Sequence, residues 1–179
     1  MRISFGPALP VGTAGEHEYF DVWLLAHVPA AEARDRLAAT FATDLSPIEA
    51  RYVNDKEPSL SAALTLAVYD VEVEGEGDLD QSLRSSLVSV IADGSLVVER
   101  KGKSKVFEFA STLLKEPDVR SSSGRVVVTV SVRIGEHGSL RPEALVNAAL
   151  ERSASNGRIL SVTRTDLFIE DDGSMRRPI

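Results

Sequence analysis

Two stretches of the chain alternate apolar and polar residues with the period of two that marks a β-strand with one buried face. In residues 125–134 the apolar face carries Val126, Val128, Val130, Val132 and Ile134. In residues 64–74 the apolar positions are Tyr69, Val71 and Val73, and the positions between and after them are acidic. The pattern predicts a strand in each stretch.

Three other stretches space their apolar residues as helices do. Asp78 is placed to cap a helix that ends at Gly94, and its stripe would consist of Leu79, Leu83, Leu87, Val90 and Ile91. Pro142 opens a second helix, with an apolar side formed by Leu145, Val146, Ala149 and Leu150. Pro29 opens a third, which we expect to end near Ala42.

The remaining elements are weaker predictions. We expect a short strand around Ile3 and Phe5, a strand at 18–26 buried on both faces, another at 48–54, and a last strand at 158–170. Residues 95–100 and 105–110 flank a basic turn as a predicted hairpin, whereas 115–124 is expected to be a loop.

The order of these elements indicates an α+β protein. From 64 to 169, with the hairpin counted as one strand unit, it reads strand, helix, strand, strand, helix, strand, which is typical of a ferredoxin-like fold. We therefore predict a ferredoxin-like βαββαβ domain at 64–170 and a flexible tail at 171–179. Residues 1–63, including a linker at 54–63, would form an incomplete ferredoxin-like unit of order β-β-α-β.

Composition removes several kinds of chemistry. The 179 residues include no cysteine, which excludes disulfides, thiolate zinc sites, a cysteine nucleophile and a cysteine-ligated iron–sulfur cluster within this chain. Three histidines, His17, His27 and His137, lack the spacing of a metal pair, so we expect no metal or other cofactor. The net charge of −7 opposes general nucleic-acid affinity. Because neither a membrane span nor a secretory signal is evident, we expect a cytoplasmic protein without membrane contact.

Candidate ligand-binding residues begin in the N-terminal loop. Pro7, Pro10 and Gly12 could shape a rigid loop whose N–H groups face a ligand, or could simply turn the chain, which is the favoured interpretation. Neither GxGxxG nor GxxxxGK[ST] occurs.

A second candidate group follows this loop. Glu18, Tyr19 and Asp21 could supply acid–base or hydrogen-bonding groups. Glu18 and Asp21 are three residues apart, hence on opposite faces of a strand, whereas Tyr19 and Asp21 share a face. A structural hydrogen bond between strand and loop is therefore favoured over a carboxylate dyad, and the neighbouring His17 is interpreted as solvated.

The basic candidates fall in two groups. The predicted hairpin carries Arg100, Lys101, Lys103 and Lys105, which could bind RNA phosphates with Phe107 or Phe109 stacking on bases, although a solvated turn is favoured. Arg141 and Arg164 are further ligand-binding candidates. Arg164 lies within a strand, where it needs a ligand or a carboxylate such as Asp166, and an internal ion pair is favoured.

Several motifs resemble one family. The N-terminal segments are Arg2-Ile3-Ser4-Phe5, Pro7-Ala8-Leu9-Pro10-Val11-Gly12 and Glu18-Tyr19-Phe20-Asp21, and later ones are Arg141-Pro142-Glu143-Ala144-Leu145 and Thr163-Arg164-Thr165. They resemble the radical SAM-linked protein family, also called domain of unknown function 2344. Members of this family normally begin earlier, with a strand and a helix carrying Ser-His-Leu-Asp, so the resemblance implies that this chain lacks them. The family's Asp-x-Arg signal after the hairpin has no clear counterpart, since Phe107-Glu108-Phe109-Ala110 occupies that place.

The resemblance implies a non-catalytic accessory or substrate-recognition module for a cobalamin-type radical SAM enzyme, with RNA or a ribosomal component as a conceivable target of that enzyme. Without cysteine the chain cannot hold the radical SAM cluster, so it would be the partner of that enzyme. The alternative is a direct RNA-binding protein that uses the basic hairpin and the sheet face. An independent hydrolase or transferase has least support, because no nucleophile and base stand at motif spacing. Homodimerisation through an exposed sheet edge is a further hypothesis.

Overall fold

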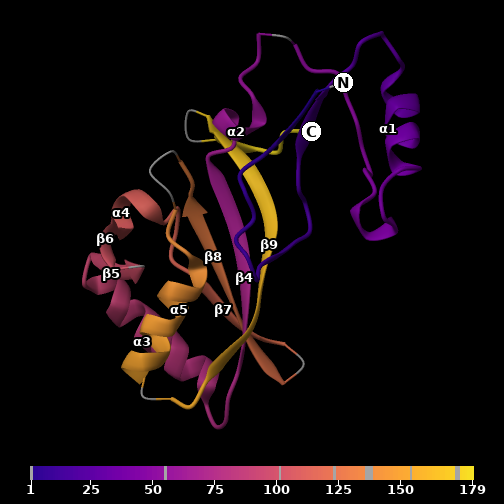
Figure 1. Cartoon of the computed structure of the whole chain (residues 1–179). Helices are drawn as coiled ribbons and strands as arrows, with labels where there is room; N and C mark the ends of the chain where they lie inside the picture. Colours follow the sequence, from indigo (N-terminus) through magenta and orange to yellow (C-terminus); the bar gives the residue numbers. More distant parts are fainter. Residues whose placement is uncertain are drawn as a thin grey trace.

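The computed structural model describes residues 2–54, 56–100, 102–122, 124–135, 139–153, 155–171 and 174–179. It is a mixed α+β structure built around one large sheet (Figure 1). The path of that sheet runs in the order β10-β9-β4-β8-β7, formed by Ser174–Arg176, Arg158–Asp171, Leu66–Glu74, Arg125–Arg133 and Asp118–Ser122. All these neighbours are antiparallel, and the short strand β2 (Ala14–Gly15) pairs with β9 in parallel.

Two helices cover one face of this sheet. α3 (Leu79–Ala92) and α5 (Pro142–Ser153) lie side by side on it (Figure 1). The predicted stripes are buried at Leu83, Leu87, Val90, Leu145 and Val146. Gly94 follows α3 at φ +80°, a left-handed conformation that favours glycine, as expected for a helix end. Asp78 occupies the N-cap position of α3, but its side chain makes no capping hydrogen bond.

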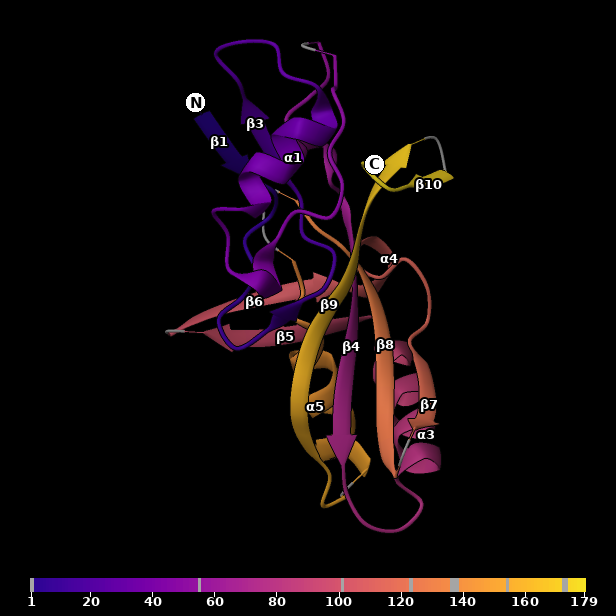
Figure 2. The ribbon, with the colours of Figure 1, turned by 90° about the vertical axis from the view of Figure 1, so that its right-hand side faces the viewer.

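The predicted hairpin forms a sheet of its own. β5 (Ser95–Arg100) and β6 (Lys103–Glu108) pair with each other and with no other described strand, and in Figure 2 they run crosswise to β9 and β4. Leu96, Val98 and Phe107 on one face pack against the core. Phe109, expected in a strand, begins the short helix α4 (Phe109–Thr112), because its N–H bonds the carbonyl of Gly94 and its ring is buried.

The expected loop at 115–124 contains the edge strand β7, so that prediction was wrong. Val119 is the only large apolar side chain of β7 and is buried, while the polar side chains around it are exposed. One apolar residue is too few to produce a visible alternation. Pairing along β8 therefore determines this strand.

The N-terminal unit, residues 2–63, is organised differently. β1 (Arg2–Phe5) pairs with β3 (Phe20–Trp23) in a separate two-stranded sheet, followed by α1 (Ala30–Ala38), the 3-10 turn η1 (Thr43–Leu45) and α2 (Leu60–Ala63). None of its described residues is buried. The strand predicted at 18–26 is therefore shorter than expected and is not buried on both faces.

One further prediction was wrong. Residues 48–54 form no strand; instead, Arg51 hydrogen-bonds the carbonyl of Pro178, and the Tyr52 hydroxyl bonds the backbone of Val28. Side-chain contacts replace strand pairing here. The C-terminal residues, expected to be a flexible tail, pair with β9 as β10 after a reversal of the chain, and Arg177 forms an ion pair with Asp166.

Candidate functional site

Arg164 is the most unusual residue of the structure, since only 1% of its surface is exposed. It lies in β9 opposite Tyr69 of β4, and the register between these strands shifts beside it, between Val68 and Tyr69. Thr165 is the extra residue of this bulge. Because facing residues of paired strands point to the same side, the bulge places Arg164 with Tyr69 on the helix-covered side of the sheet.

Glu18 and Pro7 hold the guanidinium. Its Nε donates to Glu18 Oε1 at 2.9 Å, and its Nη2 donates both to the second carboxylate oxygen and to the carbonyl oxygen of Pro7 at 2.8 Å. A fork of this kind is the strongest geometry for an arginine–carboxylate pair. The loop with the candidate residues Pro7 and Glu18 is thus fixed to β9.

Gly15 makes room for this arrangement. Ala14 and Gly15 pair with Thr163 and Arg164, and the Glu16 N–H donates to the carbonyl of Arg164 at 3.0 Å. A Cβ on Gly15 would lie 2.6 Å from Glu18 Oε1 and 2.9 Å from its Cγ. Any side chain here would push the carboxylate away from the arginine.

The electrostatics favour the charged form of Arg164. Burial alone would lower the pKa of Arg164, but the hydrogen bonds and charge of Glu18 outweigh it, so that this pKa is raised. Burial raises the pKa of the Tyr69 hydroxyl, and the neighbouring Arg164 only partly opposes this. Arg164 therefore forms an internal ion pair, with Glu18 rather than with the expected Asp166, which pairs with Arg177.

The rest of the N-terminal loop is held by backbone contacts. The Thr13 N–H donates to the Pro10 carbonyl at 3.0 Å across a turn in which Gly12 has φ +88°, a value that requires glycine. His17, expected to be solvated, instead places Nδ1 2.7 Å from the carbonyl oxygen of Thr165. No sequence pattern indicated this contact, which depends on the bulge.

Tyr19 and Asp21 contact different parts of the chain. The Tyr19 carbonyl accepts from the Gly6 N–H at 3.0 Å, and its side chain packs beside the core, where burial and Asp166 raise the pKa of its hydroxyl. Asp21 Oδ2 accepts from the Leu60 N–H at 3.2 Å, at the first residue of α2. These residues do not join Glu18 in a shared carboxylate site.

Arg141 lies just before α5 and pairs with Glu143 at 3.4 Å. The other oxygen of Glu143, Oε2, is buried and has no hydrogen-bond partner in the described part of the chain. Glu143 is close enough to Tyr69 to contribute to raising the pKa of that hydroxyl. The structure thus places Arg141 and Arg164 at the same end of the core, each paired with a carboxylate.

The basic hairpin is only partly described. Lys103 and Lys105 lie on β6, and the Lys105 ammonium sits 4.6 Å from the centre of the Phe107 ring. Lys101 and the side chain of Arg100 lie outside the described residues, as does His137. These lysines lie in the separate β5–β6 sheet, whereas Arg164 lies in the large sheet.

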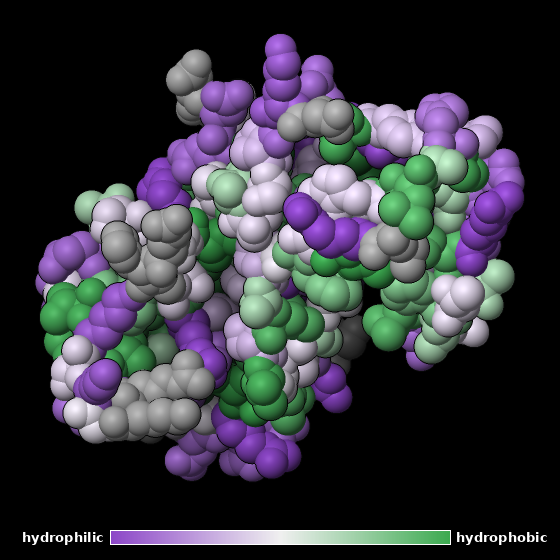
Figure 3. Space-filling model, turned by 45° about the horizontal axis from the view of Figure 1, so that its top comes forward, coloured by the Kyte–Doolittle hydropathy of each residue, from purple (hydrophilic) through white to green (hydrophobic). Residues whose placement is uncertain are grey.

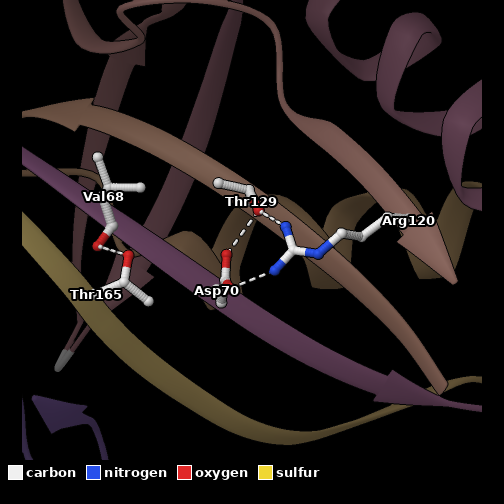
Figure 4. Close-up of polar contacts among 5 residues, drawn as sticks. All are labelled: Val68, Asp70, Arg120, Thr129 and Thr165. Atoms are coloured by element: carbon white, nitrogen blue, oxygen red, sulfur yellow. Dashed lines mark hydrogen bonds and ion pairs between the residues drawn. The ribbon is translucent and has the colours of Figure 1, made fainter. Parts of the chain in front are cut away.

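The face of the large sheet opposite α3 and α5 carries paired charges. Arg120 of β7 donates to Thr129 and to Asp70 at 2.6 Å, and Thr129 donates to Asp70 at 2.6 Å (Figure 4). The same face repeats this pattern in three further pairs, Arg125–Glu72, Arg158–Glu74 and Arg133–Glu170. Most of its arginines are therefore neutralised by carboxylates of the same face.

Exposed apolar side chains gather in the N-terminal unit instead. They include Val11, Leu25 and Ile48, whose surfaces are 100%, 94% and 81% exposed. Most of the other large exposed apolar side chains are also there, namely Ile3, Phe5, Leu9, Trp23, Leu24, Leu45, Tyr52 and Val53. Figure 3 shows green side chains in the right-hand part of the view, where this unit lies, as well as on the left and in the lower centre.

Within the described residues, no group of His, Asp and Glu side chains is arranged to hold a metal ion. Nor does any helix in the described ranges combine the length and apolar character needed to cross a membrane. Two shallow cavities of about 180 and 260 Å³ lie around the two ends of the β4–α3 connection and are lined by residues other than the candidates above.

Fold and site together define a mixed α+β protein in which a buried arginine ties an N-terminal segment to a late strand. The family described as "Uncharacterized protein conserved in bacteria (DUF2344)" matches residues 1–142, and the chain belongs to this family. A comparison with curated proteins found no match. Among solved structures, a chain of "Crystal Structure of a Cbf5-Nop10-Gar1 Complex" is similar with a TM-score of 0.40 and 15% identity, over 62% of this chain and 33% of that one. This chain thus spans about a third of that chain, and so remote a likeness carries no argument.

Proposed function

We propose that the protein is a non-catalytic recognition module that binds a protein partner through its N-terminal unit, and that the partner is a cobalamin-type radical SAM enzyme. The carrying observation is the concentration of exposed apolar side chains on residues 3–53, within a unit of which no described residue is buried. Exposed apolar patches of this kind are typical of interaction surfaces. The class of the partner is taken from the resemblance of the N-terminal motifs.

The state of the candidate polar residues supports binding rather than catalysis. Arg164, Glu18 and Asp21 each form a hydrogen bond within the chain, and these bonds hold the N-terminal unit in place. In this proposal Pro7, Pro10 and Gly12 shape the surface, and Arg141 stays paired with Glu143. The site residues act on the partner by positioning the loop that carries Leu9 and Val11.

We also infer that residues 64–170 form a ferredoxin-like domain. The support is the strand order: β8 lies between β4 and β7, which α3 connects, and β4 lies between β8 and β9, which α5 connects. Two interleaved βαβ units of this kind make up the split βαβ pattern. The β5–β6 hairpin and α4 are then an insertion between α3 and β7.

The test is a pairwise binding measurement. The chain is mixed with a purified radical SAM protein that carries a cobalamin-binding domain and comes from the same genome, and affinity is measured by calorimetry. Leu25→Asp and Ile48→Asp should each weaken binding at least about tenfold, since each would bury a charge in an apolar interface. Val88→Asp, at a residue 63% exposed on α3, is the matched control and should bind as the unchanged chain does.

Absence of a complex, or a complex that tolerates both N-terminal substitutions, would overturn the proposal. Direct RNA binding is the alternative outcome. It would show as salt-sensitive retention of RNA by the chain alone, lost on combined Lys103→Ala and Lys105→Ala substitution. The paired charges on the open sheet face argue against that outcome.

A further inference from the structure

β1 presents an edge with which no described strand pairs. The Gly6 N–H donates to the Tyr19 carbonyl at 3.0 Å, and this bond sets the alternation along the strand. Since successive residues of a strand direct their backbone groups to opposite edges, Arg2 and Ser4 face β3, whereas Ile3 and Phe5 direct theirs outward. The unpaired backbone groups thus belong to two apolar residues.

The side chains of the same two residues lie on one face of the small sheet. Ile3 is opposite Val22, and Phe5 is opposite Phe20, whose ring lies 6.0 Å from that of Phe5 and stacks on Phe41 just beyond α1. Ile3 and Phe5 nevertheless remain 36% and 68% exposed. Figure 2 shows α1 across this sheet, above the large sheet.

The side chains of β1 itself offer little of the usual protection against pairing, although α2 lies near this strand. Natural edge strands are commonly blocked by lysines, prolines or bulges, and within β1 the only charged residue is Arg2, at its start. A two-stranded sheet is also marginal by itself, whereas three or more strands with an apolar face are stable. The sheet therefore has both an open edge and an incomplete apolar face.

We propose that two copies of the chain pair through their β1 strands, antiparallel, with the two-fold axis at Ser4. In this register Ile3 of each copy lies opposite Phe5 of the other, so that the outward backbone groups meet and the two apolar side chains share one face. Arg2 falls opposite Gly6, away from the other arginine. A shift by one residue would set Ile3 against Ser4 and mix the faces.

The product is a four-stranded sheet of order β3-β1-β1-β3 with an α1 helix from each copy on its apolar face. This inference goes beyond the proposed function, because it uses the β1 edge and leaves Leu25 and Ile48 outside the new strand pairing. Dimerisation is measured on the chain alone, and partner binding on the mixture. Either proposal can thus fail without the other.

The first test is the molar mass of the purified chain by light scattering across a concentration series, with twice 19.3 kDa expected at the upper end. Ile3→Pro removes an outward N–H while leaving the bonds to β3, and should give the single-chain mass. Ile3→Val keeps the N–H and should behave as the unchanged chain does. A single-chain mass throughout the series for the unchanged chain would overturn the proposal.

The second test does not depend on the folding of the proline variant. The chain contains no cysteine, so a single introduced pair of thiols reports one contact. Facing Ser4 residues would form a non-hydrogen-bonded pair with Cα atoms about 4.5 Å apart, within the range that a disulfide spans. Under mild oxidation Ser4→Cys should yield covalent dimer at least about tenfold faster than Val11→Cys, an exposed control off the strand. Equal rates would contradict the proposed register.

Discussion

The two halves of the chain reach their structures by different means. Residues 64–171 bury valines and leucines between a sheet and two helices, whereas no described residue of 2–63 is buried. The first half is joined to the second mainly along β9: β2 pairs with it, Arg164 binds Glu18 and Pro7, and His17 contacts Thr165. Apolar packing across this junction comes from the partly buried Tyr19 and Leu60. Apolar burial thus defines the C-terminal half, while hydrogen bonds and ion pairs with β9 contribute most to positioning the N-terminal half.

The largest effect should come from the core. Leu145→Ala, at a residue that is 0% exposed, should lower the free energy of unfolding by about 2–5 kcal/mol through the cavity it leaves. Leu25→Ala, in the N-terminal unit and 94% exposed, should change it by less than about 0.5 kcal/mol. Urea unfolding followed by circular dichroism measures both. Equal losses would remove the contrast between the halves.

Loss of the buried arginine should separate the halves. Arg164→Met should cost about 3 kcal/mol, the lower end for breaking a buried pair, because the Glu18 side chain is 39% exposed and can be rehydrated. Amide exchange should speed up most in residues 6–19, and much less in 126–133. Arg152→Met, which breaks an exposed ion pair with Asp93, is the control and should leave exchange in 6–19 unchanged.

A smaller loss is expected at Gly15. Gly15→Ala should destabilise the protein by about 1–3 kcal/mol, because the new methyl group overlaps Glu18 and displaces it from Arg164. The single tryptophan, Trp23, lies in the N-terminal unit, so its fluorescence during urea unfolding reports on that half. Gly135→Ala, where nothing lies within 4 Å of the added Cβ, should leave the fluorescence transition in place.

The smallest effect is a pH dependence at Tyr69. Burial raises the pKa of its hydroxyl above the usual 10.0, so the unfolded chain loses this proton first. The stabilisation is complete below pH 10.0 and declines as the pH rises toward the higher value of the folded state. Urea midpoints between about pH 9 and pH 11 should fall more steeply for the unchanged chain than for Tyr69→Phe. Parallel curves would show that Tyr69 does not contribute.

Periodicity predicted the elements that bury a full stripe or face. β4, β8, α3 and α5 match the predictions within a few residues because Val71, Val128, Leu83 and Leu145 repeat at the period of their element. β7 was missed because a single valine makes no pattern. The strand expected at 48–54 is absent although the sequence there contains apolar residues. Its side chains, such as Tyr52, make exposed contacts with other segments, and the backbone does not pair in a sheet.

Sequence reasoning named Arg164 and Glu18 as separate candidates but did not pair them with each other. Arg164 stood out as a charged residue inside a predicted strand, and Glu18 as a carboxylate after the N-terminal loop. The contact between Glu18 and Arg164 could not be predicted, because it depends on the bulge at Thr165, which no sequence pattern indicates. This bulge turns Arg164 away from Asp166. Gly15 carried a usable signal, as a glycine between a turn and a strand often marks close approach.

The pairing of β2 with β9 also determines when the N-terminal unit can take its place during synthesis. Domains generally fold as their residues leave the ribosome, yet the N-terminal unit emerges before residues 64–171 and has no core of its own. Its arginine partner is made 146 residues after Glu18. Until that strand arrives, the carboxylate and the Pro7 carbonyl must remain hydrated and the apolar side chains around them uncovered. A segment that is translated well before β9 is thus among the last to reach its place.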